Sequence, residues 1–350
     1  MTPRELRVPD LKIKELTPSD TTRWDSFVSG NTEATFFHRA GWKSVIERAF
    51  GHRMYMLYAE RDGKIEGVYP LGHVRSLLFG NALISVPFCV YGGAAAANDE
   101  ARAALDTAAQ NLAVKLSVDY LEVRSRVPRH EDWLRKDLYV TFRKAIDPDV
   151  EKNLTNIPRK QRAMVRKGIE AGLVGELDVN IERFYEAYAH SVHALGTPVF
   201  PKNYFKILYE VFNKDVDILT VTKDGGLVAS VMNFYHRDEV LPYYGGGTAA
   251  ARELKGNDFM YWDLMRRSCE RGLKVFDYGR SKQGTGSYSF KKNWGFEPEP
   301  LYYEYFLVKA KALPNVSPTN PKYEMFITMW KKLPFSITKM IGPFIAKNLG

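Results

Sequence analysis

The chain contains the same order of elements twice, and this repeat restricts the possible folds more than any other feature. Residues 37–71 and residues 200–234 each read as an amphipathic helix, a strand, an Asp-Gly turn and a second strand. Each segment leads on to a Tyr-Gly-Gly motif at the end of a strand, then a helix and a further apolar strand. One matching segment could arise by chance, whereas the same order over this length indicates two copies of one unit.

The later parts of the two copies predict mixed sheets. The hairpins supply antiparallel strands, and the Tyr-Gly-Gly strand with its following helix and strand supplies a parallel crossover. The expected positions are 91–93 and 244–246 for the glycine-rich strand ends, 98–116 and 257–271 for the helices, and 120–123 and 275–278 for the last strands. We therefore predict an α/β fold with tandem domains at 1–150 and 151–312, followed by a helical tail at 313–350.

Charge and composition indicate a folded protein with an anionic partner. The 350 residues are 45% hydrophobic with a formal net charge of +9, which favours nucleic acid, acidic lipid or a phosphorylated substrate. A basic soluble protein without such a partner is the alternative. Cys89 and Cys269 form no CxxC pair, which indicates a reducing compartment. Without a secretory signal or a run of about 18 apolar residues, we expect a cytoplasmic protein.

A strongly basic helix is predicted at the start of the second domain. Residues 157–173 read IPRKQRAMVRKGIEAGL, with Pro158 suited to a first helical turn and Gly172 to a C-terminal stop. Its basic residues are Arg159, Lys160, Arg162, Arg166 and Lys167. At about 100° per residue the three arginines fall within roughly 60° of one another, and the lysines flank them. Guanidinium groups match phosphate oxygens in pairs, so the stripe predicts a phosphate site, with a solvated helix face as the alternative.

A glycine-rich loop follows the last strand of the second copy. The stretch 276–296, FDYGRSKQGTGSYSFKKNWGF, places Gly284 and Gly286 between two apolar segments that we read as strands. Glycine lets a backbone approach a ligand closely, and Lys291 with Lys292 suggests that this ligand is anionic. In an acyl transfer, the loop's N–H groups and Lys291 can stabilise the oxyanion or hold a phosphate of the leaving group. An exposed lysine at a strand end is the alternative.

Other candidate chemical groups carry less information. Asp277 is a candidate general base, although a carboxylate that caps a nearby N–H fits the same position. His190 and His193 share a helix face, but no third ligand lies nearby in the sequence, so we expect no metal. Cys269 lies within the predicted helix at 257–271 and is expected to be buried in the protein core. No helix-turn-helix, zinc-finger or RNP pattern favours nucleic acid.

Together, the tandem units, the basic helix RKQRAMVRKGIEAGL, the strand end YYGGG and the loop FDYGRSKQGTGSYSFKKNWGF resemble the Fem-type transferases. That family consists of tandem domains of the GCN5-related N-acetyltransferase (GNAT) fold. Its best-known members move amino acids from aminoacyl-tRNA to peptidoglycan precursors. The resemblance covers about residues 20–310. Within the family, the chain is similar to a branch that is associated with exosortase and exopolysaccharide loci.

The resemblance implies roles for particular positions. Phe290-Lys291 resembles a Phe-Lys pair whose lysine lies beside the acyl donor, and Tyr244 a substrate-contacting tyrosine at a strand end. The basic helix resembles the segment that holds the diphosphate of a nucleotide- or lipid-linked acceptor. Trp42-Lys43 resembles a helix start where a lysine approaches phosphate. The remaining expected substrate contacts are Gly245, Gly246, Ser281, Gly284, Gly286 and Lys292.

The loop TAAARELKGNDF departs from the coenzyme A motif of the wider GNAT fold. Arg252 and Gly256 are one residue too far apart, and Asp258 replaces the second glycine. An acid near the pyrophosphate position argues against tight coenzyme A binding. We therefore expect no firmly bound cofactor, with aminoacyl-tRNA or acyl-coenzyme A as the acyl donor.

The C-terminal tail has two interpretations. Residues 322–349 carry apolar residues at helical spacing, including Trp330, and five lysines against one acid. A basic amphipathic segment of this kind can lie on an anionic membrane, which predicts peripheral contact at the inner membrane. A helix that docks back onto a domain is the alternative.

We therefore expect an acyltransferase, for an aminoacyl or another acyl group. Its acceptor is an anionic, phosphate-containing precursor of the cell envelope or of an exopolysaccharide, either soluble or lipid-linked, and tRNA is a partner if it carries the donor. An acetyl-coenzyme A-dependent N-acyltransferase is one alternative. A non-catalytic protein that binds RNA or acidic lipid is the other.

Overall fold

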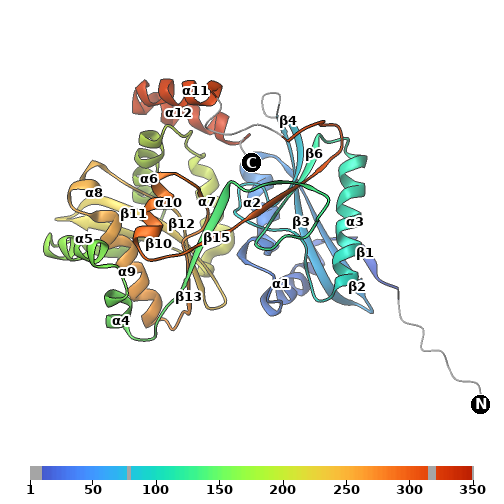
Figure 1. The fold of residues 1–350 in the computed structure, drawn as a ribbon, viewed down its shortest axis with the longest axis horizontal. Helices are drawn as coiled ribbons and strands as arrows, with labels where there is room; N and C mark the ends of the chain where they lie inside the picture. Colours follow the sequence, from blue (N-terminus) through green and yellow to red (C-terminus); the bar gives the residue numbers. More distant parts are fainter. Residues whose placement is uncertain (1–9, 77–79, 314–320, 349–350) are drawn as a thin grey trace, which may run out of the picture. The chain divides into compact units, whose positions relative to one another are not determined.

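The structure, a computed structural model, describes residues 10–76, 80–313 and 321–348 (Figure 1). The chain forms two compact units, each with its own eight-stranded sheet. Both sheets are mixed, as predicted, because one parallel pair in each accompanies antiparallel neighbours. None of the helices in these residues is both long enough and apolar enough to span a membrane.

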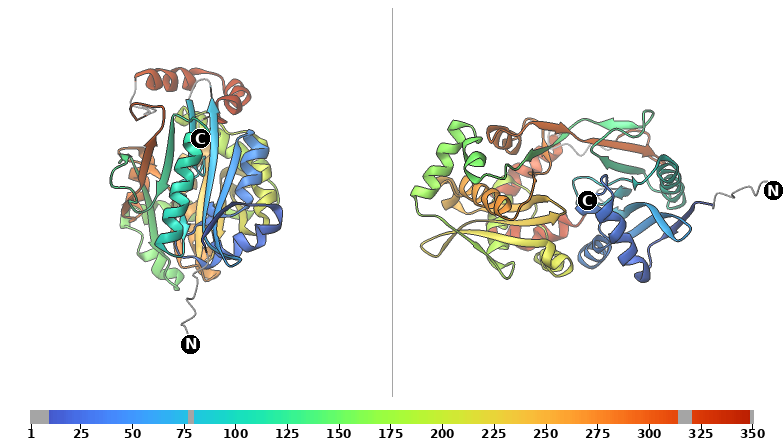
Figure 2. Two further views of the ribbon diagram at one scale, coloured as in Figure 1. Left: turned by 90° about the vertical axis from the view of Figure 1, so that its right-hand side faces the viewer. Right: turned by 90° about the horizontal axis from the view of Figure 1, so that it is seen from below.

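The first unit is built on a sheet with the strand order β1-β2-β3-β4-β6-β16-β7, and β5 pairs with β3. Its strands are β1 (Lys12–Glu15), β2 (Arg53–Arg61), β3 (Lys64–Ser76), β4 (Gly80–Ser85), β5 (Ala95–Ala96), β6 (Tyr120–Ser125), β7 (Leu134–Lys136) and β16 (Tyr302–Leu307). Its helices are α1 (Thr21–Gly30), α2 (Gly41–Phe50) and α3 (Asp99–Lys115). The parallel strands β4 and β6 are joined through α3, which lies over the sheet in the left view of Figure 2. Leu83, Leu105 and Leu121 form part of the core beneath α3.

The second unit is built on a sheet with the strand order β14-β8-β13-β12-β11-β10-β9, and β15 pairs with β8. Its strands are β8 (Tyr139–Ala145), β9 (Val174–Leu177), β10 (Val216–Lys223), β11 (Gly226–His236), β12 (Glu239–Gly247), β13 (Val275–Asp277), β14 (Ser281–Lys282) and β15 (Pro298–Pro300). Its helices are α4 (Val150–Thr155), α5 (Arg159–Glu170), α6 (Glu182–Leu195), α7 (Lys202–Phe212), α8 (Ala249–Glu253), α9 (Gly256–Glu270), α10 (Gly286–Asn293), α11 (Pro321–Lys332) and α12 (Phe335–Ala346). The predicted basic helix, the helix near 257–271 and the tail helices are therefore present.

The two predicted hairpins have the same turn geometry. In the first, Asp62 and Gly63 have φ of 48° and 76°, and in the second Asp224 and Gly225 have φ of 50° and 79°. Positive φ at both central residues is the property of the tight turn whose twist matches a β-hairpin. The Asp-Gly pairs therefore set the register of β2 with β3 and of β10 with β11.

The predicted boundary at 150/151 differs from the observed units because each sheet takes a strand from the other half of the chain. β8 lies before the predicted boundary but pairs with β13, β14 and β15 in the second sheet. β16 lies near the end of the predicted second domain but joins the first sheet between β6 and β7. The units therefore comprise residues up to Arg135 with Tyr303–Ala312, and Lys136–Tyr302 with the C-terminal helices.

Two local predictions were wrong. The motif at 91–93 does not end a strand, because β4 stops at Ser85 and the chain then turns through Val86 and Phe88, whose φ values are 50° and 68°. The apolar segment after the glycine loop is not a strand but the helix α10, whose first turn is capped by Thr285.

The tail was predicted as one helical region, and its residues 314–320 lie outside the described part of the chain.

Candidate functional site

The strands β12 and β13 are paired over only a short distance. β12 pairs with β11 from Glu239 to Gly247, but it pairs with β13 only at Glu239 and Val240. A bulge at Tyr243 interrupts the register with β11. Beyond Val240, β12 therefore has no strand partner on this side within the described residues.

The turn that follows β13 is fixed by Asp277. This carboxylate is fully buried and accepts hydrogen bonds from the Arg143 guanidinium at 2.7 Å, the Thr141 hydroxyl at 3.2 Å and the Gly279 N–H at 2.8 Å. The bond to Gly279 is the capping contact that the sequence allowed as the alternative to a general base. Asp277 therefore orders the turn, and its buried oxygens are already used by protein donors.

Lys291 extends from α10 to the same turn. Its Nζ donates to the carbonyl oxygens of Tyr278 at 2.8 Å, Gly279 at 2.9 Å and Arg280 at 3.1 Å. An ammonium group has three N–H bonds, so these contacts use all of them. Burial lowers the pKa of Lys291 to about 7, an effect that the Asp277 carboxylate opposes and Arg280 reinforces. Lys291 thus lies at the predicted place but binds protein carbonyls instead of projecting from a strand end.

The predicted ligand-binding part of the loop begins directly after these contacts. Ser281 is 3% exposed, and its hydroxyl has no hydrogen-bond partner among the described residues. A buried hydroxyl without a partner is unusual, and a ligand oxygen or water would satisfy it. A Cβ on Gly284 or Gly286 would meet nothing within 4 Å, so the backbone faces open space at both positions. Lys292 on α10 is exposed.

Tyr244, Gly245 and Gly246 are held by packing within the unit. The Tyr244 hydroxyl lies 2.9 Å from the Tyr204 hydroxyl, and its ring belongs to an aromatic cluster formed with α6 and α7. A Cβ on Gly246 would lie 2.4 Å from the Ala187 carbonyl oxygen, so this glycine allows α6 to pack closely on β12. On Gly245 a Cβ would approach Val231 at 3.3 Å. The contacts of this YGG motif are those of packing on α6, α7 and β11.

The helix α5 presents basic side chains to solvent. Arg159, Lys160, Arg166 and Lys167 are exposed, and within the described part of the chain none of them forms an ion pair with an acid. The fifth, Arg162, is partly buried and donates to the Thr155 carbonyl at 2.6 Å. Four cations without acidic partners on one short helix remain available to an external anion.

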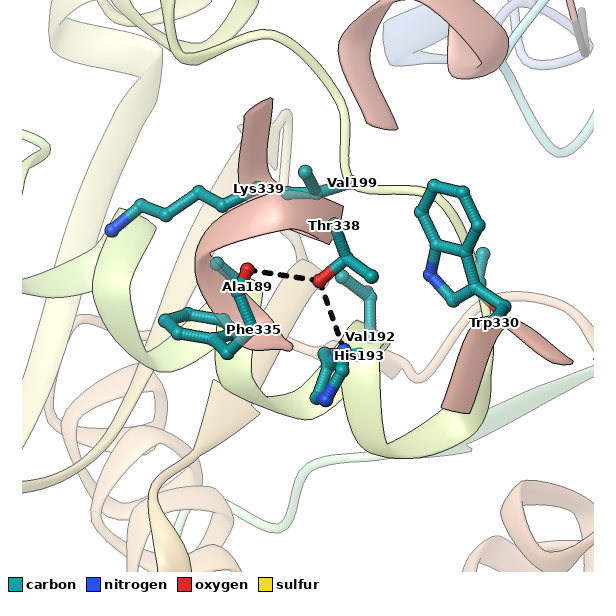
Figure 3. A pocket seen from close by; sticks show the side chains of 9 residues that line it. Ala189, Val192, His193, Val199, Trp330, Phe335, Thr338 and Lys339 are labelled. Carbon is teal, nitrogen blue, oxygen red and sulfur yellow. Dashed lines mark hydrogen bonds between the residues drawn. The ribbon is translucent and has the colours of Figure 1, made fainter. Parts of the chain in front are cut away.

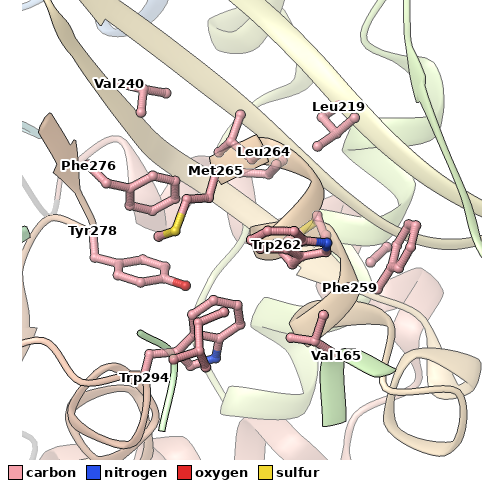
Figure 4. Packing of buried hydrophobic residues seen from close by; sticks show 14 of the residues in the cluster. Val165, Leu219, Val240, Phe259, Trp262, Leu264, Met265, Phe276, Tyr278 and Trp294 are labelled. Atoms are coloured by element: carbon pink, nitrogen blue, oxygen red, sulfur yellow. The ribbon is translucent and has the colours of Figure 1, made fainter. Parts of the chain in front are cut away.

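The opposite side of α5 is anchored to α9. Val165 is fully buried, and a Cβ on Gly168 would lie 2.8 Å from Phe259 Cβ, so the two helices are in close contact (Figure 4). Gln161 donates to Asp258 at the start of α9, and the Trp294 indole N–H donates to the same oxygen at 3.1 Å. These bonds connect α5 with the segment that follows α10.

The Asp258 side chain points into the protein, so it does not oppose an anion in the way that the sequence suggested. It is 8% exposed, and burial raises its pKa while the bonds from Gln161 and Trp294 oppose the increase. Its side chain is therefore part of the core contact between α5, α9 and Trp294. The negative charge that we expected to oppose a pyrophosphate does not project from the α9 N-terminus.

Lys144 on β8 was missed by the sequence analysis. A Cβ on Gly295 would lie 3.1 Å from Pro158 Cδ and 3.6 Å from Lys144 Nζ, so this ammonium lies near Pro158, the N-cap residue of α5. Burial lowers the pKa of Lys144. No sequence signal links position 144 to position 158, because β8 reaches the second sheet only through the unexpected strand exchange.

Lys43 lies in the first unit, on α2. Its Nζ bonds to the Glu47 carboxylate at 2.6 Å and approaches the Met54 carbonyl oxygen at 3.3 Å. The Glu47 carboxylate also accepts from the Met54 N–H at 3.0 Å. These contacts connect α2 to β2, and the role of Lys43 towards phosphate stays a prediction.

The chain is similar to several solved structures, although no curated protein sequence matches it. Residues 151–292 match the family model described as an acetyltransferase (GNAT) domain. FemX aligns with a TM-score of 0.67 at 14% identity, over 90% of this chain and all of its own. The C-terminal domain (DUF2156) of a protein named lysylphosphatidylglycerol synthetase, from Agrobacterium fabrum, aligns with a TM-score of 0.57 at 12% identity, over 82% of this chain and 91% of its own.

A tandem GNAT protein from the clavulanic acid biosynthesis pathway aligns with a TM-score of 0.53 at 12% identity, over 87% of this chain and all of its own. At such identities the three likenesses establish the fold, and the family model covers the second unit. The chain therefore has the Fem-type tandem GNAT fold, and residues 151–292 match the model of an acetyltransferase (GNAT) domain.

Proposed function

We propose that the protein transfers an aminoacyl or other acyl group to an anionic, phosphate-containing precursor of the cell envelope or of an exopolysaccharide. The observation that carries this proposal is the set of unpaired cations on α5, a helix that is anchored to the GNAT domain. The names of two structural neighbours, FemX and lysylphosphatidylglycerol synthetase, are compatible with an aminoacyl donor.

The phosphate of the acceptor is bound at α5. Arg159 begins the helix, and its N-terminal N–H groups have no side-chain cap because Pro158 occupies the capping position. Uncapped N–H groups and the helix dipole attract an anion, and Lys144 beside Pro158 adds a positive charge. Arg166 lies two turns further along and can bind a second phosphate oxygen through its planar guanidinium.

The chemical step forms a bond between an acceptor nitrogen or oxygen and the donor carbonyl carbon, and it breaks the bond from that carbon to the leaving group. Negative charge develops on the carbonyl oxygen during the attack. Because Lys291 donates to Tyr278, Gly279 and Arg280, the groups assigned to stabilise this charge are backbone N–H groups of β12 beyond Val240 and the Ser281 hydroxyl. Lys291 positions the turn that carries Ser281. Asp277 is assigned the same kind of role, and no residue is assigned as the general base.

Calorimetric titration of the protein with uridine diphosphate tests the phosphate site. The variant Arg159→Glu/Arg166→Glu should weaken the affinity at least about tenfold, since two charge-assisted contacts become repulsive. The control Lys309→Glu/Lys311→Glu makes the same change in net charge at exposed positions of the first unit and should change the affinity less than about twofold. Equal losses of affinity in the two variants would mean that binding depends on the overall charge of the protein and not on a site at α5.

An acetyl-coenzyme A-dependent N-acyltransferase is the second candidate, favoured by the match to the acetyltransferase domain and by the inward direction of Asp258. Parallel titrations with acetyl-coenzyme A and with aminoacyl-tRNA distinguish the donors. Saturation by acetyl-coenzyme A at micromolar concentration, with transfer of the acetyl group, would support the second candidate. Tight RNA binding without any transfer product would contradict both enzyme functions.

A further inference from the structure

The C-terminal helices α11 and α12 are docked on α6 through one face each. The Thr338 hydroxyl lies 2.9 Å from His193 Nδ1 (Figure 3). The His190 ring stacks on Phe335 at 4.2 Å between centroids. Trp330 lines the same small pocket and is 3% exposed. Of the two interpretations of the tail, docking onto a domain is therefore observed. Because Trp330 is buried in this contact, it is not available as an interfacial anchor.

The opposite faces of both helices expose large apolar side chains. The most exposed are Met325 and Met329 on α11, each 62% exposed, and Met340 and Phe344 on α12, which are 66% and 68% exposed. At about 100° per residue, each pair falls within roughly 40° on its helix. Thr338 and Gly342, which are buried, point away from the exposed pair on α12. Two apolar faces that nothing in the described chain covers indicate an interaction surface.

The charge on this C-terminal segment is mostly positive. Residues 321–348 contain five lysines and one acid, Glu324. Lys339 bonds to Glu186 on α6 at 2.6 Å, whereas Lys331 and Lys332 are exposed and form no ion pair within the described residues. At about 100° per residue, Lys332 falls on the same side of α11 as Met325, whereas Lys331 lies near Gly196 at the end of α6. Exposed methionine and phenylalanine beside an unpaired lysine match an anionic lipid surface, where apolar side chains enter the acyl region and the ammonium meets phosphate.

We propose that the exposed apolar faces of α11 and α12 insert into the interface of an anionic membrane. Each helix has 12 residues, which suits a position in the plane of the interface. A second copy of the chain fits this face less well, because self-association would bring Lys331 and Lys332 of both copies together. Membrane attachment here does not depend on which group the protein transfers.

Flotation of the full-length protein with vesicles tests this proposal. Wild-type protein should float with vesicles of phosphatidylcholine and phosphatidylglycerol in equal parts, and at least about tenfold less with phosphatidylcholine alone. The variant Met340→Asp/Phe344→Asp should lower binding to the anionic vesicles at least about tenfold, because charged groups replace the inserted side chains. The matched control Val114→Asp/Val179→Asp places the same charges at exposed apolar positions outside the tail and should bind as wild type.

A second variant separates the contribution of the lysines from that of the apolar side chains. Lys331→Glu/Lys332→Glu should remove the preference for the anionic lipid, while Lys309→Glu/Lys311→Glu should retain it. Circular dichroism and thermal unfolding show whether each variant is folded. Equal flotation of wild type and Met340→Asp/Phe344→Asp would overturn the proposal. So would a concentration-dependent dimer that these two substitutions abolish, because the face would then be an interface between copies.

Discussion

Lys291 illustrates how far a single residue can be interpreted from sequence. Its place beside the glycine loop could be predicted, because the two are close in the chain. Its direction could not, because the aromatic segment after Gly286 was read as a strand and belongs to the helix α10. On that helix the side chain points back to the carbonyls of Tyr278, Gly279 and Arg280. Tyr244 and Gly246 show the same limit, since their partners lie far away in the sequence, as do the Thr141 and Arg143 partners of Asp277.

The lowered pKa of Lys291 predicts a specific pH dependence of stability. The folded protein loses the Lys291 proton near pH 7, whereas an unfolded lysine keeps it to about 10.5. Between these values the unfolded state binds more protons, so this residue makes stability rise with pH by at most about 1.4 kcal/mol per pH unit. The difference in unfolding free energy between wild type and Lys291→Met should therefore increase from pH 7 to pH 10. A constant difference over that range would mean that the Lys291 pKa is ordinary.

The glycines predicted to contact substrate should separate into two kinds. Gly246→Ala places a Cβ 2.4 Å from the Ala187 carbonyl oxygen and should destabilise the protein by about 1–3 kcal/mol. Gly286→Ala meets nothing within 4 Å and should leave the unfolding free energy unchanged or slightly higher. Urea denaturation followed by circular dichroism measures both. Equal stability of the two variants would contradict the close packing of α6 on β12.

At the scale of elements, local sequence signals identified the structure well where one signal was strong. The Asp-Gly turns fixed both hairpins, and Pro158 with Gly172 marked the start and end region of α5. The helix α10 was missed because Gly286, aromatic residues and only eight positions give a weak helical pattern. Thr285 before Gly286 was the available signal, since threonine is a common N-cap.

The cap of α10 can be tested directly. The Thr285 hydroxyl accepts the Tyr288 N–H at 3.4 Å, so Thr285→Ala should lower the unfolding free energy by about 1 kcal/mol. Thr285→Ser retains an accepting hydroxyl and should remain within about 0.5 kcal/mol of wild type. Denaturant titrations of the three proteins provide the comparison. If alanine and serine at this position were equally stable, the hydroxyl would not cap the helix.

At the scale of the whole molecule, the tandem fold could be predicted from the repeat, but the composition of each unit could not. The exchange of β8 and β16 depends on strand pairs between distant segments, such as Phe276 with Lys144, and no local pattern specifies such pairs. Lys144 entered the candidate site through this exchange. The same physical reason explains both the wrong boundary and the missed residue.

The strand exchange predicts how a cut chain behaves. A site for a specific protease, inserted between β8 and α4, divides the chain near the boundary expected from sequence. The two fragments should co-elute under native conditions, because each contains a strand of the other fragment's sheet. They should separate in denaturant. Separation of folded fragments under native conditions would contradict the observed strand order.

The central claim is that α5 binds the phosphate of an acceptor for the GNAT domain. A crystal structure of the protein with uridine diphosphate tests it most directly. We predict phosphate density within about 3 Å of the guanidinium groups of Arg159 or Arg166 on α5. Phosphate density at the N-terminus of α9, with none at α5, would contradict the claim.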